Sequence, residues 1–252
     1  MADLKVGVQL HPQATTMAEL REAWIKADSL GVDSLWTWDH FFPLYGDPEA
    51  SHFECWSILA AMAATTSHAT IGPMVTPMSY RNPDLLADIA RTVDHISSGR
   101  VVLGMGSGWF ERDYDEYGYE FGTAPGRLKI FGQELPRVVR RLENLNPPPM
   151  GPLPILIGGT GPKVTLRLTA QYAQMHNMVG KTPEQAKGIM ATLDEWCEKL
   201  GKDSASIERT TMVEANADVE AWAEVGVRHL IYMAGNPYDL TEVERLLAIR
   251  DS

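Results

Sequence analysis

Strand-like and helix-like segments alternate eight times along this chain, and this alternation limits the possible folds more than any other feature. Short apolar runs end at polar or glycine-rich turns, and a segment with apolar residues at helical spacing follows each run. The expected strands cover residues 5–10, 34–38, 69–76, 100–106, 154–159, 175–179, 206–213 and 227–233. The expected helices cover residues 17–30, 54–66, 82–97, 127–143, 162–173, 182–200, 217–225 and 240–250. Eight such units predict an α/β fold of the (β/α)8 TIM barrel type.

The chain length agrees with one barrel. Its 252 residues match the typical size of this fold, so we expect a single domain over residues 1–252. The sixth and seventh strand patterns are the weakest, and without them an open, doubly wound sheet is the alternative. Residues 146–154 (NPPPMGPLP) have the composition of a domain linker. We interpret them as a rigid connection, because the alternation resumes unchanged after them.

Charge and composition argue against several classes of protein. The net charge of −11 argues against nucleic acid as the main partner, because binding would need a basic face. No apolar run reaches the roughly 18 residues of a membrane-spanning helix, and the first residues lack a signal-peptide pattern. We therefore expect a cytoplasmic protein without membrane contact. Cys55 and Cys197 are too few for a zinc cluster or a disulfide framework, so each is expected to be a buried or half-buried thiol.

The stretch LWTWDHFFP, residues 35–43, ends the second expected strand on Asp39 and His40. Active sites of barrels gather at the carboxyl ends of the strands, so both side chains are expected at the barrel mouth. A histidine can act as an acid, a base or a hydrogen-bond donor near neutral pH. Neighbours in an extended chain point to opposite faces, so we expect the two side chains to contact different parts of a ligand. A purely structural interpretation, an aspartate N-cap followed by a packed histidine, fits the spacing equally well.

Two adjacent strands end in glycine-rich turns, GMGSGW after the fourth strand and IGGTGPK after the fifth. Backbone amides in such turns can cradle a phosphate, and a helix that begins after Gly161 would add its N-terminal dipole. Neither turn has P-loop spacing, and GMGSGW lacks the third glycine of a dinucleotide fingerprint. Each turn taken alone is as readily structural as ligand-binding. Their position on neighbouring strands favours a phosphate-bearing ligand.

Other kinds of catalytic site lack a signature. The seven histidines contain no HxH or HExxH pair, so no metal site is expected. Ser107 lies outside a G-x-S-x-G elbow, and Cys55 has no electropositive neighbours. Glu54 and Glu111 are acid or base candidates near the mouth, although solvated loop carboxylates are the simpler interpretation. Aromatic residues cluster around the strand ends, and those not needed by the core would suit a flat aromatic ligand.

Three segments resemble the luciferase-like superfamily of flavin and deazaflavin enzymes, in particular its branch that uses coenzyme F420. They are SLWTWDHFFP, the run from TIGPMVTPMSYRNP to GWFERDYDEYG, and PILIGGTGPKVTLRLTAQYA. They stand in the family order and cover most of residues 4–180, and the middle run is the most specific. The resemblance implies a (β/α)8 barrel that holds the F420 ring at its mouth. It also implies hydride transfer between that ring and a small organic substrate.

The same resemblance implies roles for individual residues. The Asp-His pair of the family falls on Asp39 and His40, with His40 catalytic and Asp39 holding the cofactor or the loop. The family has a bulge in its third strand, often with a non-proline cis peptide. It falls within residues 73–76 and places Val75 and Thr76 behind the ring. The phosphate-binding loops fall on Gly106, Ser107, Gly108, Gly158, Gly159, Thr160 and Gly161.

This chain departs from the family pattern in three places. Some sugar-phosphate dehydrogenases of the branch carry a glutamate proton donor where this chain has Trp109, which counts against that reaction. The usual Ala-Asp-Gly-Trp/Phe run reads AQMH at residues 173–176, so that part of the pocket is expected to be altered. The insertion before the fifth strand is trimmed, since residues 145–154 are few and rich in proline. Either the mouth is open or a second subunit completes it, and we expect a homodimer.

Three functions are in competition. The leading one is an F420-dependent oxidoreductase, and the sequence Asp39-His40-Phe41 favours it. The first alternative is an FMN-dependent, oxygen-using monooxygenase of the same superfamily. The second is a flavin- or deazaflavin-binding protein without turnover. The sequence does not identify the substrate.

Overall fold

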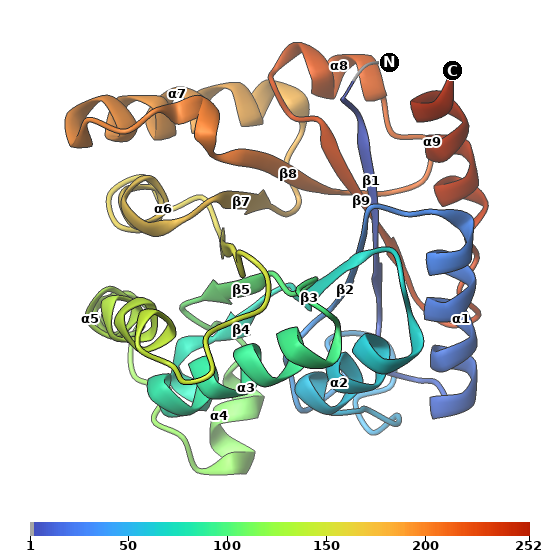
Figure 1. Cartoon of the computed structure of the whole chain (residues 1–252), viewed down its shortest axis with the longest axis horizontal. Helices are drawn as coiled ribbons and strands as arrows, with labels where there is room; N and C mark the ends of the chain where they lie inside the picture. Colours follow the sequence, from blue (N-terminus) through green and yellow to red (C-terminus); the bar gives the residue numbers. More distant parts are fainter. Residues whose placement is uncertain (1–2) are drawn as a thin grey trace.

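In the computed structural model, which describes residues 3–252, nine parallel strands form one sheet that is rolled into a barrel (Figure 1). The strands are β1 (Lys5–Leu10), β2 (Ser34–Thr37), β3 (Thr70–Pro73), β4 (Thr76–Pro77), β5 (Leu103–Gly106), β6 (Ile155–Gly158), β7 (Met175–Met178), β8 (Glu208–Val213) and β9 (His229–Ala234). Their order in the sheet is β3-β2-β1-β9-β8-β7-β6-β5-β4. Because β3 and β4 are two pieces of the third expected strand, all eight expected strands are present.

The barrel closes beside β3. A parallel bridge joins Ile71 to Val101, and the Val102 amide donates a hydrogen bond of 2.9 Å to the Ile71 carbonyl. Strands β6, β7 and β8, which include the two weakest patterns, pair in parallel register within the sheet. The predicted (β/α)8 barrel is therefore confirmed, and the open doubly wound sheet does not apply.

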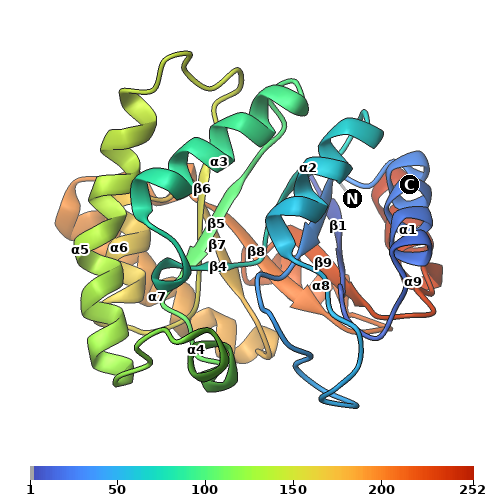
Figure 2. The same cartoon turned by 90° about the horizontal axis from the view of Figure 1, so that it is seen from below.

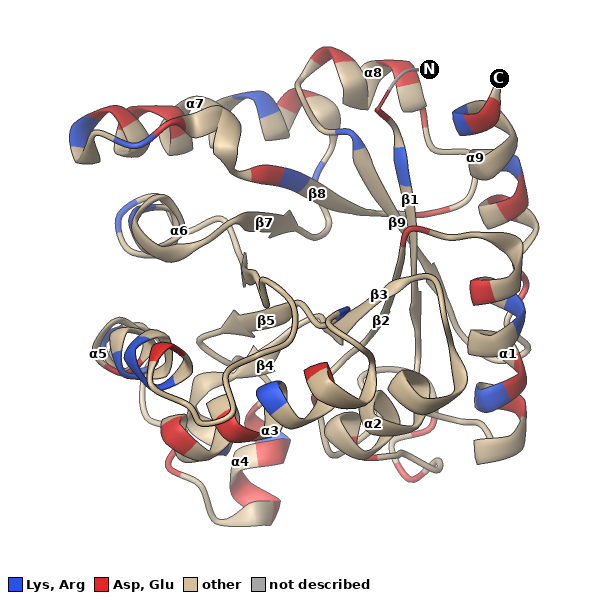
Figure 3. Ribbon diagram, viewed as in Figure 1, with Lys and Arg blue, Asp and Glu red and all other residues tan. Residues whose placement is uncertain are grey.

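Helices cover the outside of the barrel (Figure 1). Within residues 3–252, those that follow strands are α1 (Met17–Leu30), α2 (Cys55–Thr65), α3 (Pro83–Ile96), α5 (Ala124–Glu143), α6 (Thr165–Tyr172), α7 (Pro183–Leu200), α8 (Val219–Glu224) and α9 (Thr241–Asp251). Lys, Arg, Asp and Glu lie mainly on these helices and on loops, whereas the strands carry few charges (Figure 3). This distribution is expected for parallel strands that are buried on both faces.

The ends of α1 show how the sequence sets the helix boundaries. The Thr16 side chain accepts a hydrogen bond from the Glu19 amide (3.3 Å), and the Glu19 carboxylate accepts one from the Thr16 amide (2.9 Å). This capping box stabilises the first turn. Gly31 follows the last turn in the left-handed conformation, with φ of 84°, which glycine adopts without strain.

The segment after β5 differs from the expectation of a loop up to residue 126. A short helix, α4 (Glu111–Tyr117), forms within it, and Gly118 ends this helix in the left-handed conformation. The next helix, α5, begins three residues earlier than expected, with Pro125 in its first turn. Proline is tolerated there because the first amides of a helix have no acceptor within it. Helix α4 and the loop of residues 39–53 project from the same side of the barrel (Figure 2).

Apolar side chains fill two separate regions. Successive residues of a strand point alternately into the barrel and out toward the helices, so each strand contributes to both. The larger cluster lies between strands and helices and includes Leu35, Ile71, Leu103, Ile157 and Leu230. A smaller cluster fills the barrel interior and contains Trp36, Met74, Val102, Leu156, Met175, Met212 and Ile231.

Residues 146–154 pack against α3 as a rigid connection, which confirms that interpretation. The Asp94 carboxylate accepts hydrogen bonds from the amides of Met150 (2.8 Å) and Gly151 (3.0 Å). The Arg91 guanidinium donates to the carbonyl of Pro147 (2.9 Å). None of the helices in residues 3–252 combines the length and the apolar character needed to cross a bilayer.

Candidate active site

A cavity of about 400 Å³ opens at the carboxyl ends of the barrel strands. It is lined by Gln9, His11, Trp38, His40, Leu44, Tyr45, Met74, Val75, Pro77, Gly106, Ser107, Gly108, Trp109, Gly158, Gly159, Asn177, Val179, Met212 and Met233. This set includes seven of the residues that the sequence predicted for the site: His40, Val75, Gly106, Ser107, Gly108, Gly158 and Gly159. The fold therefore brings together predicted site residues that lie up to about 120 positions apart in the sequence, from His40 to Gly159.

A second hollow, of about 530 Å³, lies at the opposite end of the barrel, around the starts of β1, β8 and β9. Several of its charged side chains pair with one another: Lys5 with Glu208 at 2.7 Å, and Arg209 with Asp194. Active sites of barrels lie at the carboxyl ends of the strands, whereas the other end serves stability. We therefore assign the candidate site to the smaller cavity.

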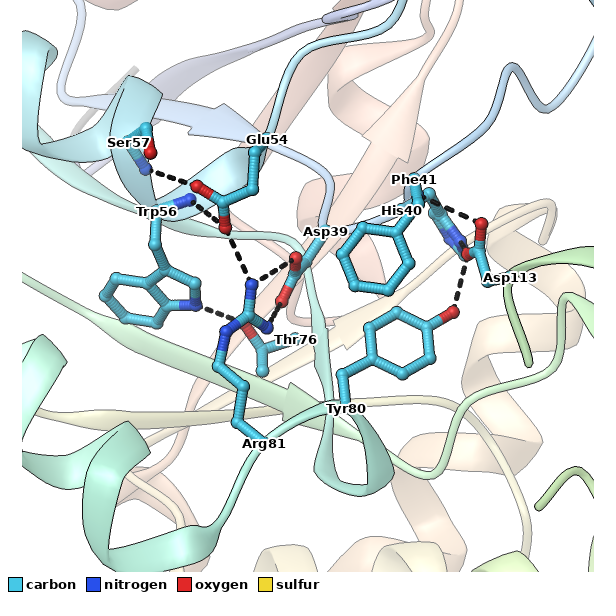
Figure 4. A network of polar contacts seen from close by, with 10 residues as sticks. All are labelled: Asp39, His40, Phe41, Glu54, Trp56, Ser57, Thr76, Tyr80, Arg81 and Asp113. Atoms are coloured by element: carbon cyan, nitrogen blue, oxygen red, sulfur yellow. Dashed lines mark hydrogen bonds and ion pairs between the residues drawn. The ribbon is translucent and has the colours of Figure 1, made fainter. Parts of the chain in front are cut away.

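Asp113 fixes the orientation of His40. Nδ1 of His40 lies 2.6 Å from Oδ2 of Asp113, and both side chains are buried (Figure 4). Oδ1 of Asp113 accepts hydrogen bonds from the amides of Phe41 (3.0 Å) and Phe42 (3.2 Å). The hydroxyl of Tyr80 donates to Oδ2.

These contacts determine that Asp113 is ionised and which ring nitrogen of His40 is free to bind a ligand. Burial raises the pKa of Asp113, but the hydrogen bonds from His40 and Tyr80 outweigh it and lower the pKa below its usual value. An ionised carboxylate only accepts hydrogen bonds, so Nδ1 of His40 must carry a proton. Nε2 is then the nitrogen of His40 that remains for a ligand in the cavity.

Aromatic side chains hold the His40 ring from the sides. The rings of Trp109 and Phe110 pack edge-on against it, with ring centroids 5.7 Å and 5.6 Å away. Trp109 is 62% exposed, whereas His40 is 5% exposed. Trp109 therefore forms the outer rim of the cavity, and His40 lies deeper in its wall.

The Asp39 carboxylate faces Arg81 and Glu54, on the side away from His40 (Figure 4). The Arg81 guanidinium binds both of its carboxylate oxygens and also binds Glu54 (2.7 Å), the N-cap of α2. The hydroxyl of Thr76 accepts a hydrogen bond from the indole of Trp56 (3.1 Å). Asp39 and Thr76 are fully buried and do not line the cavity, so their position does not support the expected cofactor contact. Asp39 and His40 thus have different partners in the protein, Arg81 for Asp39 and Asp113 for His40.

Val75 explains two of the glycines. The peptide bond between Met74 and Val75 is cis, within the residues 73–76 where the family bulge was expected. A Cβ atom on Gly106 would lie 2.8 Å from Cγ2 of Val75, and one on Gly158 would lie 3.0 Å from its Cγ1. Both turns therefore need glycine so that the break between β3 and β4 can pack between them. Packing against Val75 therefore accounts for glycine at positions 106 and 158 without any ligand.

Strand β7 supports the second glycine turn. The Gly159 amide donates to the carbonyl of Asn177 (3.1 Å), and Nε2 of His176 donates to the carbonyl of Gly159 (2.8 Å). Burial lowers the pKa of His176 to about 4, so its ring is neutral and one nitrogen is a donor. The departure from the family pattern at residues 173–176 therefore places His176 behind the glycine turn and outside the cavity lining, whereas Asn177 lines the cavity.

The end of the second glycine turn lies outside the cavity. Thr160 and Gly161 are not among the lining residues. Helix α6 begins at Thr165 rather than at residue 162, because a turn precedes it. The helix dipole that was expected directly after Gly161 is therefore displaced from the turn.

The sequence did not reveal Asp113 as a functional residue. It lies in the run GWFERDYDEYG, where several acidic residues stand close together and none differs from the others in pattern. The two carboxylates that were weighed instead do not line the cavity: Glu54 caps α2, and Glu111 is exposed at the start of α4. Among the described residues, no group of three or more His, Cys, Asp or Glu side chains is arranged to hold a metal ion.

Comparison with known proteins identifies relatives of the chain. The sequence profile of the luciferase-like monooxygenase family matches residues 2–248. The F420-dependent glucose-6-phosphate dehydrogenase of Amycolatopsis mediterranei (strain U-32) is 27% identical over 241 aligned residues, which cover 85% of this chain and 70% of the relative. Pyrimidine monooxygenase RutA of Acinetobacter baylyi (strain ATCC 33305 / BD413 / ADP1) is 26% identical over 215 aligned residues, which cover 74% of this chain and 53% of the relative.

A solved structure shares the whole fold. An F420-dependent secondary alcohol dehydrogenase in complex with an F420-acetone adduct superposes with a TM-score of 0.87 at 17% sequence identity. The superposition covers 98% of this chain and 99% of that chain, so the trimmed barrel is an architecture found elsewhere. The resemblance inferred from the motifs is confirmed by the family match and by a relative from the F420 branch. This chain belongs to the luciferase-like monooxygenase family.

Proposed function

We propose that the protein is a coenzyme F420-dependent oxidoreductase that transfers a hydride between the deazaflavin ring and a small, uncharged organic substrate. The observation that carries this proposal is the His40–Asp113 pair in the wall of a largely apolar cavity edged by glycine turns. The relative that uses F420, at 27% identity, supports the choice of cofactor.

The cavity fits a flat ring with an anionic tail. The side chains of Trp38, Met74 and Val75 offer apolar surface against which a ring can pack. Ser107 and Gly159 line the cavity, and backbone amides in such turns are suited to phosphate oxygens. Bound F420 would supply a ring carbon that accepts or donates a hydride.

The residues of this chain position the substrate and move its proton. When an alcohol is oxidised, the hydroxyl proton passes to Nε2 of His40, and the carbon-bound hydrogen leaves as hydride. In the reverse direction Nε2 returns the proton to the carbonyl oxygen. Asp113 keeps the ring of His40 in one orientation and stabilises the positive charge that it gains.

The lining of the cavity favours uncharged substrates. No Lys, Arg, Asp or Glu is found among the described residues that line it. A sugar phosphate would therefore meet no side-chain cation for its phosphate group. By the family resemblance, Trp109 stands where some sugar-phosphate dehydrogenases of the F420 branch carry a glutamate, which also counts against that substrate. Leu44, Val179 and Met212 instead suit the carbon skeleton of an alcohol or of its carbonyl product.

Cofactor titrations test this proposal. The purified chain is titrated with F420 and with FMN, and binding is followed by fluorescence. F420 reduction is then assayed with a panel of uncharged alcohols and with glucose 6-phosphate. We expect F420 binding and turnover with an uncharged alcohol. Tight FMN binding with NADH-driven oxygen uptake would indicate the monooxygenase instead, and F420 binding without any turnover would indicate a binding protein.

We also propose that the protein is a cytoplasmic homodimer. Leu85 and Ile96 on α3 are 53% and 45% exposed beside a groove between α2 and α3, and such exposed apolar residues favour an interface. Cys55 and Cys197 are buried free thiols, which is typical of a reducing compartment. Light scattering should give twice the chain mass of 27.9 kDa for the wild type and a lower mass for Leu85→Glu. Fractionation of the native cells tests the compartment.

A further inference from the structure

Tyr45 and His11 form a second polar pair in the candidate cavity. Both residues line it, together with His40. The hydroxyl of Tyr45 contacts Nδ1 of His11, and it lies 3.3 Å from Nε2 of the same ring. The proposed proton transfer at His40 makes no use of this pair, so its role needs a separate explanation.

The ring of His11 is held firmly at the end of β1. It stacks on Trp38, with ring centroids 4.4 Å apart and an angle of 25° between the planes. The His11 amide donates to the carbonyl of Ala234 (3.0 Å), and the hydroxyl of Tyr238 donates to the His11 carbonyl (2.7 Å). A Cβ atom on Gly235 would lie 3.1 Å from Nδ1 of His11, so Gly235 packs closely against one edge of the ring.

Tyr45 is held in place although it lies on a long loop. The buried side chain of Gln13 donates to the carbonyl of Tyr45 (2.7 Å) and accepts from the amide of Leu44 (2.7 Å). The ring of Tyr45 also packs edge-on against Trp38, with centroids 5.8 Å apart. These contacts keep the phenol at the cavity wall even though the residue is about half exposed.

The chemistry of the two groups sets the direction of their hydrogen bond. Burial lowers the pKa of His11 to about 4, so the ring is neutral at pH 7. Burial raises the pKa of Tyr45 to about 12, so the phenol keeps its proton. A phenol is a stronger acid than a neutral imidazole N–H, and an imidazole nitrogen is a stronger base than a phenol oxygen. Tyr45 therefore donates to Nδ1 of His11, and only the lone pairs of its oxygen remain for a ligand.

We propose that Tyr45 determines substrate specificity by accepting a hydrogen bond from a second hydroxyl group of the substrate, distinct from the hydroxyl that reacts. The reacting hydroxyl gives its proton to His40 and cannot satisfy Tyr45 at the same time. The preferred substrate is therefore an uncharged alcohol that carries a further hydrogen-bond donor. This inference rests on the proposed function, because it assumes that an alcohol occupies the cavity.

Matched pairs of small ligands test the proposal by equilibrium binding. The probes are 1,2-, 1,3- and 1,4-cyclohexanediol and their monomethyl ethers, which keep the oxygen but lose one donor. Binding is measured by calorimetry on the full chain with and without F420. We expect at least one diol to bind about five-fold more tightly than its ether, the effect of one ordinary hydrogen bond. Equal binding of every diol and its ether by the wild type would overturn the proposal.

Three variants assign the effect to Tyr45. Tyr45→Phe should remove the preference for the diol, whereas Tyr117→Phe should keep it, because Tyr117 is an exposed tyrosine of α4 that does not line the cavity. His11→Phe leaves the phenol free to donate, so the ether should then bind as tightly as the diol. A diol preference that persists in Tyr45→Phe would contradict the assignment.

The measurements with and without F420 distinguish a failure of this inference from a failure of the proposed function. If F420 neither binds nor turns over, the proposed function fails, whereas the ratios measured on the chain alone still decide the role of Tyr45. If F420 turns over an alcohol but Tyr45→Phe leaves every ratio unchanged, the proposed function stands and the role of Tyr45 is wrong.

Discussion

The carboxylate of Asp113 lies 2.6 Å from Nδ1 of His40, although the two residues are 73 positions apart in the sequence. Asp113 comes from α4, and His40 comes from the loop after β2. The pair leaves a single ring nitrogen for a ligand, and two backbone amides and the Tyr80 hydroxyl hold the carboxylate in turn. A proton-handling histidine needs such a fixed orientation, because a rotated ring presents the wrong nitrogen.

Replacing either member of this pair should affect turnover more than cofactor binding. We expect His40→Ala to lower kcat by about 100-fold, the usual contribution of a general acid or base. Asp113→Asn should lower kcat by about ten-fold or more, because the amide no longer favours the protonated Nδ1. The F420 dissociation constant should change by less than about three-fold in both variants. Steady-state kinetics and fluorescence titration measure the two quantities.

The exposed His68 provides the control for this prediction, since His68→Ala removes an imidazole outside the cavity lining. This variant should keep both kcat and F420 affinity. Unchanged turnover in His40→Ala would refute the catalytic assignment. A loss of F420 affinity in Asp113→Asn equal to the loss of turnover would show that Asp113 shapes the cofactor site instead of positioning His40.

Gly106→Ala should destabilise the barrel through Val75. The new Cβ would lie 2.8 Å from Cγ2 of Val75, and a β-branched side chain has little freedom to move aside. We expect a loss of about 1–3 kcal/mol in the free energy of unfolding, as for other overpacked sites. Urea denaturation measures it.

A double variant separates the clash from other effects. Val75→Ala removes the methyl groups that Gly106→Ala meets, so the double variant should be more stable than the sum of the two single effects predicts. Gly188→Ala in α7 is the control, because no atom lies within 4 Å of its added Cβ, and it should be neutral or stabilising by about 1 kcal/mol. Additive losses in the double variant would refute the role of Val75.

Local sequence patterns predicted the strands because each buried strand carries its own apolar run and ends at a glycine or polar turn. Helix α4 was missed because only Asp113 and Tyr114 of its residues are buried, so it lacks an apolar face of helical spacing. Asp113 and Arg112 join it to the loop of residues 39–53, and no local pattern encodes these contacts. The early start of α5 was missed because the loop was expected to run to Gly126, whereas Pro125 suits the first turn of a helix.

The site was predicted where family motifs coincide with strand ends, as at His40 and the two glycine turns. Its pairings were not predictable, because partners lie far apart in sequence: Tyr45 and His11 are 34 positions apart, and Arg81 and Asp39 are 42 apart. Only the closed barrel brings these side chains into contact. The expected cofactor contact of Asp39 came from the family resemblance. In the structure its carboxylate is bound by Arg81 and does not line the cavity.

Glu208 should make the stability of the protein depend on pH below about 4.5. Its carboxylate lies 2.6 Å from Nδ1 of His229 and 2.7 Å from Nζ of Lys5. Burial raises the pKa of Glu208, but the hydrogen bond from His229 and the charge of Lys5 outweigh it and lower the pKa from 4.5 to about 2. A lowered carboxyl pKa stabilises the fold above the unfolded-state value and loses this effect as the pH falls toward 2.

The variant Glu208→Gln tests this dependence. At pH 7 it should lose about 2 kcal/mol of unfolding free energy, which is below the full linkage value because part of the side chain is exposed. Between pH 4.5 and pH 2 its stability should fall less steeply than that of the wild type, and chemical denaturation across this range measures the slope. The exposed Glu198 of α7 supplies the control Glu198→Gln, which should keep the wild-type slope. Identical slopes for Glu208→Gln and the wild type would contradict the prediction.

Asp39→Asn should cost stability rather than cofactor affinity. The side chain of Asp39 is fully buried and that of Arg81 is 13% exposed, so the variant leaves a guanidinium with only the partly exposed Glu54 as its counter-charge. Loss of one partner from a buried ion pair costs about 3–5 kcal/mol, and we expect the lower end of this range because Glu54 remains. The double variant Asp39→Asn/Arg81→Gln should recover part of this loss, since no unpaired charge is left.

Urea denaturation gives the stabilities of these variants, and F420 titration well below the melting temperature should show less than a two-fold change in affinity. An F420 affinity more than ten-fold weaker with unchanged stability would instead show that Asp39 contacts the cofactor.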